Sequence, residues 1–370
     1  MRIGIPRERK AGECRVAITP SGVNRLVSAG NRVLIETDAG SKSGFSDQEF
    51  TAAGAEILAQ LSEVWDGCDL LVKVKEPAPE EYQFFRSDLS LFCFLHPAAE
   101  KDLTLKMLDS GLLAFDYDLL MLDDGSLPIL RPMSVIAGKL AVQIGARGLQ
   151  SDNGGRGVLL GGCQGVAPAK VLVLGAGAAG GSAVEVAAGM GAEVVVIDLL
   201  EEKLKHLERV YQGAVGTVRG KLASKTELEQ ELTDVDLLIG AVLVPGALAP
   251  KLISREMIKQ MPKGSVLVDI CIDQGGCAES SRAQSLENPY YRESEVLHYA
   301  VPNMPALVPR TSTLALTAAN FPWLENICSL GPEKAAAEIP ELGRSLVCRG
   351  GKLCNKTVAE SLDLVEFQAS

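Results

Sequence analysis

The fold of this chain is decided by the stretch Val171-Leu172-Val173-Leu174-Gly175-Ala176-Gly177-Ala178-Ala179-Gly180. Its four leading aliphatic residues predict a strand that is buried on both faces, as in a parallel sheet. The glycines then follow the spacing Gly-x-Gly-x-x-Gly. Gly175 would make the tight turn, Gly177 would let the backbone approach a ligand, and Gly180 would pack a helix closely against the strand. The N–H groups that begin such a helix favour phosphate groups.

A second strand follows the glycines and supports the same interpretation. Residues 192–197 are mostly aliphatic, and the run ends in Asp198, about 20 residues beyond the glycines. A carboxylate there accepts hydrogen bonds from ribose hydroxyls and repels a 2′-phosphate. A lone glycine-rich turn would be the alternative, but the two strands together predict a dinucleotide site that prefers NAD to NADP.

Length and composition limit the function classes. At 370 residues, with 47% hydrophobic and 22% charged residues, the chain predicts two globular α/β domains. The net charge of −11 argues against nucleic acid or an acidic membrane surface as a partner. We expect no membrane association, because no apolar run approaches the ~20 residues that a bilayer span requires. Residues 1–8 predict a strand followed by charge rather than a signal peptide.

The nine cysteines are scattered, and no Cys-x-x-Cys occurs. This usage is typical of a reducing compartment, so we expect a cytoplasmic protein. Cys271 and Cys277 lie close together in the sequence, but two small buried residues are a simpler interpretation than a pair of metal ligands. We predict no metal.

Strands and helices alternate along both halves of the chain. In the first half, strands are predicted at residues 2–6, 32–36, 69–75, 90–95 and 111–118, and Thr19-Pro20 predicts a helix start. Residues 127–132 predict a linker, followed by a long helix over 134–149. Later strands are predicted at 236–241, 265–269 and 297–301. Helical patterns from residue 305 onward indicate a return to the first domain, because two crossings are the usual way to build a closing cleft.

Four residues at predicted strand ends are candidates for chemistry, because ligands of open parallel sheets bind there. His96 follows the apolar run 91–95, and an imidazole titrates near working pH, which suits general acid–base catalysis. Lys75 could polarise a carbonyl or hold a carboxylate, and Arg15 could clamp a carboxylate through two hydrogen bonds. Asp273 lies beyond the strand that ends in Asp269. The alternatives stay open: a structural histidine, a solvent-exposed strand end carrying Lys73 and Lys75, and a surface salt bridge for Arg15.

Several longer motifs together resemble the superfamily of alanine dehydrogenases and proton-translocating transhydrogenases over nearly the whole chain. The motifs are Arg15–Pro20, Val72–Pro77, Pro132–Ser134, Gly175–Gly180, Gly240–Gly246, Val268–Gly276 and Pro302–Pro305. This chain differs from the usual family pattern in having Val135 after Ser134, Asp118 after Tyr117, no proline in Gly161–Gly165, and the stretch Ala318–Asn320.

The resemblance implies NAD-dependent, reversible oxidative deamination of L-alanine to pyruvate and ammonium. It implies that Arg15 and Lys75 bind the oxo acid, that His96 is the general acid–base, and that Asp273 is the second catalytic residue. It further implies a set of cofactor-binding residues: Met133, Ser134, Gly175, Gly177, Ala178, Ala179, Gly180, Asp198, Lys203, Val242, Leu243, Ile270, Asp273, Arg282, Val301, Asn303 and Met304.

The family also implies a central NAD-binding domain over residues 131–304, a substrate domain over 1–130 and 305–370, both doubly wound and Rossmann-like, and a homohexamer. Two other functions stay open. One is a related NAD-dependent amino-acid or imine reductase with another substrate. The other is the NAD(H)-binding module of a transhydrogenase.

Overall fold

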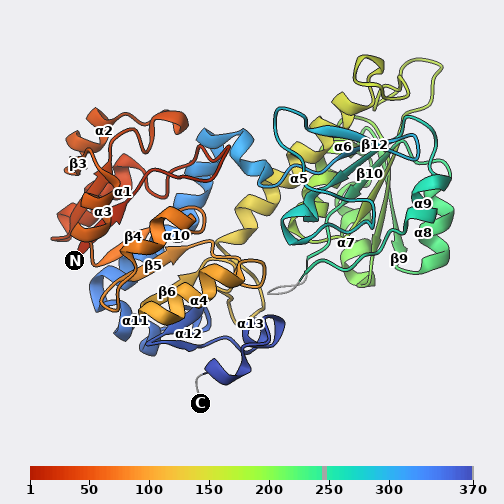
Figure 1. Cartoon of the computed structure of the whole chain (residues 1–370). Helices are drawn as coiled ribbons and strands as arrows, with labels where there is room; N and C mark the ends of the chain where they lie inside the picture. The colour runs from red at the N-terminus through yellow and green to blue at the C-terminus, as the bar shows by residue number, and fades with distance from the viewer. Residues whose placement is uncertain (244–247, 369–370) are drawn as a thin grey trace. The chain divides into compact units, whose positions relative to one another are not determined.

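The computed structural model describes residues 1–243 and 248–368, which Figure 1 traces from red to blue. The chain forms two compact units: residues 1–133 with 306–368, and residues 134–243 with 248–305. The division falls inside helix α5 (Leu130–Gly148). The prediction of a linker over 127–132 is therefore wrong at its end, because the helix already begins at Leu130. Residues 244–246 of the Gly240–Gly246 motif, and residues 369–370, lie outside the described residues.

The first unit contains an eight-stranded sheet in the order β15-β14-β6-β5-β4-β1-β2-β3. The strands β1 to β6 are parallel, whereas β14 runs antiparallel to β6 and β15 antiparallel to β14. The last two strands come from the end of the chain, so both chain ends build this unit. Its elements are β1 (Arg2–Ile5), α1 (Pro20–Ser28), β2 (Arg32–Glu36), α2 (Asp47–Ala52), β3 (Glu56–Leu58), α3 (Leu61–Gly67), β4 (Leu70–Val72), β5 (Ser90–Cys93), α4 (Lys101–Ser110), β6 (Leu113–Asp116), α10 (Pro309–Leu330), α11 (Pro332–Glu338), α12 (Pro340–Arg344), β14 (Leu346–Arg349), β15 (Lys352–Leu353) and α13 (Lys356–Ser361).

The second unit contains a seven-stranded sheet in the order β12-β13-β11-β10-β7-β8-β9. All of these strands are parallel except β12, which pairs with β13 in the antiparallel sense. Its elements are β7 (Lys170–Leu174), α6 (Ala178–Gly189), β8 (Glu193–Asp198), α7 (Glu201–Val210), β9 (Thr217–Leu222), α8 (Lys225–Leu232), β10 (Leu237–Gly240), α9 (Arg255–Gln260), β11 (Val266–Asp269), β12 (Tyr290–Glu293) and β13 (Val296–Tyr299).

Both sheets repeat one winding order. If the six parallel strands of each unit are numbered along the chain, they lie side by side as 3-2-1-4-5-6, the Rossmann order. The prediction of two Rossmann-like doubly wound α/β domains is confirmed. In this order the first and fourth strands are neighbours, and later strands are added to the sheet in opposite directions from them. Ligands are therefore expected at the carboxyl ends of β1 and β4 in one unit and of β7 and β10 in the other.

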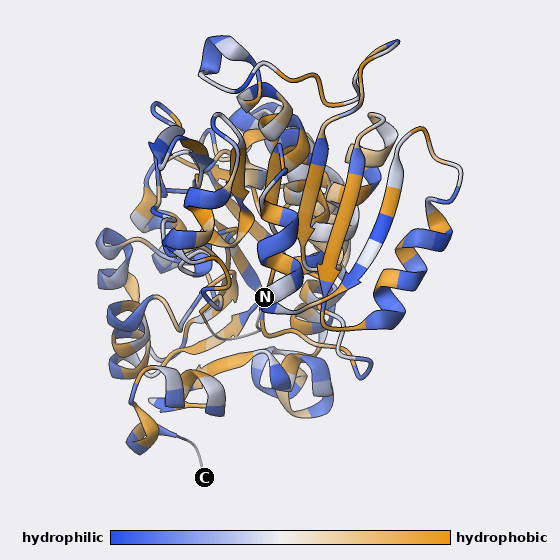
Figure 2. Ribbon diagram, turned by 90° about the vertical axis from the view of Figure 1, so that its right-hand side faces the viewer, coloured by the Kyte–Doolittle hydropathy of each residue, from blue (hydrophilic) through white to orange (hydrophobic). Residues whose placement is uncertain are grey.

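Local sequence explains where many of these elements begin. The Thr19 hydroxyl accepts the Gly22 N–H and Pro20 occupies the first helical position, so α1 starts where it was predicted. Ser46 and Glu49 form a capping box at the start of α2. Figure 2 shows the strands mainly in the colour of hydrophobic residues, while the helices carry many hydrophilic positions. Among the described residues, no helix is both long and apolar enough to cross a bilayer.

Some local predictions were wrong. Arg15 does not lie at a strand end but in an irregular segment before α1. The strands β4 and β6 are shorter than predicted, so Lys73 and Lys75 follow β4 instead of lying within a strand over 69–75.

Candidate active site

The carboxyl ends of the central strands in the first unit bring together residues that are far apart in the sequence. Glu8 follows β1, Lys75 follows β4, His96 follows β5, and Asp118 follows β6. Since these strands are neighbours in one parallel sheet, their ends open onto the same edge. This edge is the one at which the winding order predicts a ligand.

His96 is the centre of this group. Its Nε2 atom lies 2.6 Å from Lys75 Nζ, and its Nδ1 atom lies 2.6 Å from Asp118 Oδ2. The ring stacks on that of Phe94, with centroids 5.9 Å apart and planes at 6°. Its backbone has a φ of 46°, in the left-handed region that few residues other than glycine adopt. Such strain persists where surrounding contacts enforce it, and it is frequent at functional sites.

The charges around His96 determine its protonation. Burial and the nearby Lys75 charge lower the pKa of the imidazole, but the charge and hydrogen bond of Asp118, with help from Glu76, outweigh them and raise it above 6.5. The contact between Nε2 and Lys75 requires one donor and one acceptor. Either the ammonium donates to a neutral imidazole or an imidazolium donates to a neutral amine, so the pair is suited to moving a proton.

Lys75 is held by acidic residues on both sides. The Glu8 carboxylate accepts the backbone N–H of Val74 at 2.6 Å and that of Lys75 at 3.4 Å. Glu76 Oε2 lies 3.6 Å from Lys75 Nζ. Although burial alone would raise the pKa of Glu76, the charges of Lys75, His96 and Lys10 lower it to about 2. The Glu76 carboxylate therefore stays ionised beside the Lys75 ammonium, whereas the Glu8 carboxylate fixes the main chain around Lys75.

Lys73 has a different role from its neighbour. It is only 1% exposed, and its ammonium donates to both carboxylate oxygens of Glu81, at 2.7 and 2.8 Å. Burial lowers the pKa of Lys73, but the charges of Glu8 and Glu81 more than compensate and raise it. The alternative of a solvent-exposed strand end is wrong for both lysines, since Lys75 is 4% exposed.

Arg15 is also buried, at 2% exposure. Its Nε and Nη2 atoms donate to the two oxygens of Glu13 at 2.8 and 2.6 Å, and its Nη1 lies 3.1 Å from Met133 Sδ. The alternative of a surface salt bridge is therefore wrong. Glu13 orients the guanidinium, and Met133, from the first turns of α5, packs against it.

The glycine-rich turn of the second unit has the geometry that its sequence predicted. Gly175 has a φ of 99°, and a Cβ on Gly180 would lie 1.7 Å from the Gly175 carbonyl oxygen, so both positions need glycine. A Cβ on Gly177 would meet nothing within 4 Å, so the space beside this backbone is open. Ala178 and Ala179 form the first turn of α6, which runs for twelve residues. Its first N–H groups have no partner within the helix and can bind a pyrophosphate.

Asp198 ends β8 beside this turn. Its Oδ2 accepts the Ala176 N–H at 2.6 Å, and its Oδ1 accepts the Leu200 N–H at 2.9 Å. Each carboxylate oxygen can accept a second hydrogen bond, so the group can bind ribose hydroxyls while it organises the turn. Lys203 is exposed on α7. The residues of this edge therefore fit a dinucleotide.

The other predicted cofactor residues lie mainly beyond β10, β11 and β13. Asp273 is exposed, and its Oδ2 accepts the Asn303 N–H at 3.0 Å, so the segments after β11 and β13 meet there. Arg282 instead stacks over the Tyr291 ring, 4.1 Å from the centroid. The remaining members of the set are Ser134 on α5, Val242 and Leu243 after β10, Ile270 after β11, and Val301 and Met304 after β13.

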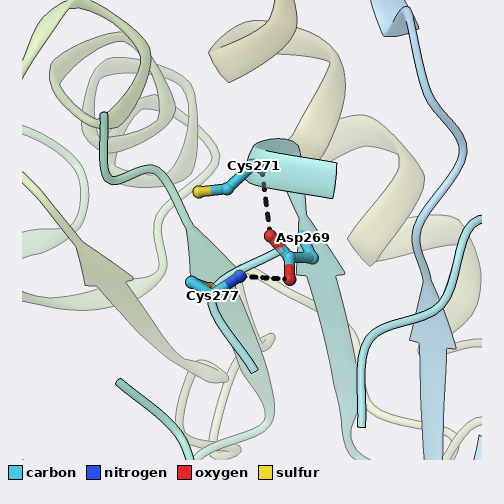
Figure 3. A group of neighbouring side chains, drawn as sticks. All are labelled: Asp269, Cys271 and Cys277. Carbon is cyan, nitrogen blue, oxygen red and sulfur yellow. Dashed lines mark hydrogen bonds between the residues drawn. The ribbon is translucent and has the colours of Figure 1, made fainter. Parts of the chain in front are cut away.

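Asp269, Cys271 and Cys277 form a buried group whose potential ligand atoms lie within 4.8 Å of one another (Figure 3). The Asp269 carboxylate accepts the N–H groups of Cys271 and Cys277, at 3.0 and 2.9 Å, and the Ser281 hydroxyl. Its oxygens thus organise the loop after β11.

Sequence reasoning missed several residues that shape the site. Glu13 and Asp116 are buried acids beside predicted functional residues, and the Glu8 side chain is only 4% exposed. Asp118 was noted only as a departure from the family pattern. A usable signal was present for Glu13, because an acid two residues before a buried arginine can pair with it. No local signal marks Asp116 or Asp118, because their contacts depend on how β5 and β6 pair.

Comparisons with known proteins confirm the resemblance. Residues 4–137 match the N-terminal domain, and residues 141–356 the C-terminal domain, of the family described as alanine dehydrogenase/PNT. An alanine dehydrogenase from Halomonas elongata is 45% identical over 370 residues, which are 100% of this chain and 99% of that relative.

Solved structures agree. A structure titled L-alanine dehydrogenase matches with a TM-score of 0.91 and 43% identity, over 98% of this chain and 100% of its own. A transhydrogenase from Sinorhizobium meliloti matches with a TM-score of 0.78 and 25% identity, over 96% of this chain and 99% of its own. Both similarities extend over the two units described above.

Proposed function

The chain belongs to the alanine dehydrogenase/PNT family, and from this premise we propose that it catalyses the reversible, NAD-dependent oxidative deamination of L-alanine. L-Alanine, NAD⁺ and water would give pyruvate, ammonium, NADH and a proton. The observation that carries the proposal is the contact of His96 with both Lys75 and Asp118 at the edge where the winding order predicts a ligand.

The cofactor would be held by the second unit. Gly177 leaves open space for a pyrophosphate, the start of α6 would bind its charge, and Asp198 would bind the ribose and disfavour NADP. When bound, NAD supplies the hydride acceptor for the substrate Cα–H bond. The residues after β10, β11 and β13, from Val242 and Ile270 to Met304, would line the remainder of its groove.

The first unit would manage the substrate and its protons. Arg15 and Lys75 would hold the carboxylate and oxygen of the oxo acid, which converts an encounter into a reactive geometry. His96 would take a proton from the water that adds to the imine carbon. It would then return that proton to nitrogen as the C–N bond breaks and ammonia leaves. Asp273 would orient water and ammonia.

The test is NADH oxidation with pyruvate and ammonium, with 2-oxobutyrate, glyoxylate and 2-oxoglutarate run in parallel. Fast oxidation that requires ammonium and is best with pyruvate is the expected result. Activity with another oxo acid alone would overturn the substrate and favour a related amino-acid or imine reductase. NADH binding without any oxidation would favour a transhydrogenase-like module.

Two further properties belong to the proposal. The family resemblance supports a homohexamer, which mass measurement of the native protein tests directly. The nine cysteines, all free, support a reducing compartment such as the cytoplasm.

A further inference from the structure

Two acidic side chains flank Tyr117 behind His96. Asp116, the last residue of β6, is 0% exposed, and the Asp118 side chain is 15% exposed. Asp116 Oδ1 accepts the N–H groups of Leu95 at 3.1 Å and Asp118 at 3.0 Å. Asp118 Oδ2 contacts His96 Nδ1. The other oxygen of each acid, Asp116 Oδ2 and Asp118 Oδ1, is buried and finds no hydrogen-bond partner among the described residues.

Two ionised carboxylates are unfavourable in such a place. Each would keep an unsatisfied buried oxygen, and the two like charges would repel in a medium that screens them poorly. A proton on one acid removes the like-charge repulsion, and a carboxylic acid can donate a hydrogen bond where a carboxylate only accepts. Aspartates that share a buried position commonly share one proton for this reason.

The surroundings decide which acid holds the proton. Asp118 has a cationic partner in His96, so its charge is compensated. Burial first, and then the negative charge of Asp118, raises the pKa of Asp116 to about 7, although His96 and the two N–H donors oppose this. The proton therefore belongs on Asp116 below neutral pH.

The other groups around Asp116 do not determine its protonation. Cys93 on β5 is its register partner, and burial raises the pKa of that thiol well above 9, which keeps it neutral. On the opposite side, the main-chain oxygen of Ser345, just before β14, accepts the Asp116 N–H. Lys75 and Glu76, which follow β4, act on His96. Asp118 and His96 are thus the ionisable partners to which Asp116 responds.

We propose that Asp116 is a positioning residue that, as a neutral acid, donates a hydrogen bond to Asp118 and thereby limits the basicity of His96. This rests on the proposed function only in giving His96 a catalytic task. When Asp116 loses its proton, a second negative charge faces the imidazole and the Asp118 oxygen loses its donor. Both changes favour imidazolium, so the base needed for water addition becomes scarcer.

The test uses the full-length protein and a readout independent of activity. The chain has only 3 histidines, so selective labelling of the imidazole carbons gives a simple spectrum in which the His96 signal is assigned by its loss in His96→Gln. Titration is followed in the wild type, Asp116→Asn and Asp116→Ala. Asp109→Asn, on an exposed site of α4, is the matched control.

Asparagine is neutral at every pH and can still donate to Asp118. In Asp116→Asn we expect the His96 titration to become a simple one-proton curve with its midpoint about one pH unit lower. Asp116→Ala leaves Asp118 without a hydrogen-bond donor, so the His96 midpoint in this variant should stay nearer to that of the wild type. The kcat–pH profile should move with the midpoint, while the KM for NADH stays unchanged. An unshifted His96 midpoint in Asp116→Asn would overturn the proposal.

A second measurement covers variants that fail to fold. Infrared difference spectra of the wild type between about pH 6 and pH 9 should show the C=O stretch of a protonated carboxylic acid that disappears with the His96 titration. Its absence at the acidic end overturns the proposal. Because neither measurement requires turnover, loss of the alanine dehydrogenase assignment would leave both results interpretable.

Discussion

The Nε2 atom of His96 lies 2.6 Å from the Nζ atom of Lys75, although each side chain can carry a positive charge. The contact exists because acids surround the pair, with Asp118 on the imidazole and Glu76 beside the ammonium. Removing either cation should therefore change the proton affinity of the other.

Replacing Lys75 by methionine tests this coupling. The Lys75 charge lowers the pKa of His96, so Lys75→Met should raise the His96 midpoint above its wild-type value while it increases the KM for pyruvate. Histidine-selective NMR and steady-state kinetics measure the two effects. Lys42→Met, on an exposed lysine of the same unit, is the control. A lowered or unchanged His96 midpoint would show that the lysine is not the charge acting on the ring.

His96→Ala should sharply reduce turnover and leave NADH binding intact, because the residue belongs to the first unit and the dinucleotide turn to the second. Loss of a general acid–base group typically costs 10²–10⁴-fold in rate. Rapid kinetics and NADH fluorescence titration measure the two properties. His206→Ala is the matched control on an exposed face of α7. Lost NADH binding in His96→Ala would contradict the role assigned to it.

Asp198→Asn should weaken NAD binding and reduce the preference for NAD over NADP. The Asp198 carboxylate would accept hydrogen bonds from the ribose hydroxyls, worth about 1.5–3 kcal/mol, and its charge would repel a 2′-phosphate. The KM for NAD should rise about tenfold or more, with little change in kcat. Glu202→Gln, nearby on α7 and exposed, should leave both cofactors unaffected. An unchanged NAD/NADP ratio in Asp198→Asn would remove Asp198 from the ribose site.

Gly177→Ala separates binding from stability. The added Cβ meets no atom within 4 Å and the φ of −76° suits alanine, so the free energy of unfolding should change by only about 0.5 kcal/mol. The methyl group would nevertheless occupy the space that a pyrophosphate needs, so NAD affinity should fall at least about tenfold. Gly189→Ala, at the other end of α6 and equally open, is the control. Equal NAD affinities in the two variants would refute the placement of the pyrophosphate.

His298 predicts a pH dependence of stability. It is 0% exposed on β13, its Nε2 lies 2.9 Å from Ser280 Oγ, and burial lowers its pKa to about 4. The unfolded chain binds this proton near pH 6.5 and the folded chain does not. The contribution of the neutral, buried His298 to the free energy of unfolding is therefore complete above pH 6.5 and is lost as the pH falls toward 4. It amounts to about 3 kcal/mol.

Urea unfolding of wild type and His298→Gln across this range measures the effect. The variant should lack that part of the pH slope, whereas His206→Gln, which removes an exposed imidazole, should keep it. Identical slopes in wild type and His298→Gln would mean that His298 accepts a proton in the folded state.

Local sequence features predicted the strand, the turn and the helix around the three glycines. Val171–Leu174, the three glycines and Asp198 form one continuous segment, so their places follow from strand and helix periodicity and from the conformations open only to glycine. The helix start at Thr19-Pro20 was predictable for the same reason. Errors appeared at element boundaries, where β4 ends at Val72 and α5 begins at Leu130, because these boundaries depend on what packs against them.

The sequence by itself determined the α/β class, the doubly wound order, the family and the residue types available for chemistry. Only the tertiary structure decided that Lys73 pairs with Glu81 while Lys75 contacts His96, and that Asp116 and Asp118 lie behind the imidazole. The physical reason is the sheet. Lys75 and His96, 21 positions apart, meet because parallel strands align their carboxyl ends. The protonation of the groups gathered there then depends on burial and neighbouring charges that no local pattern encodes.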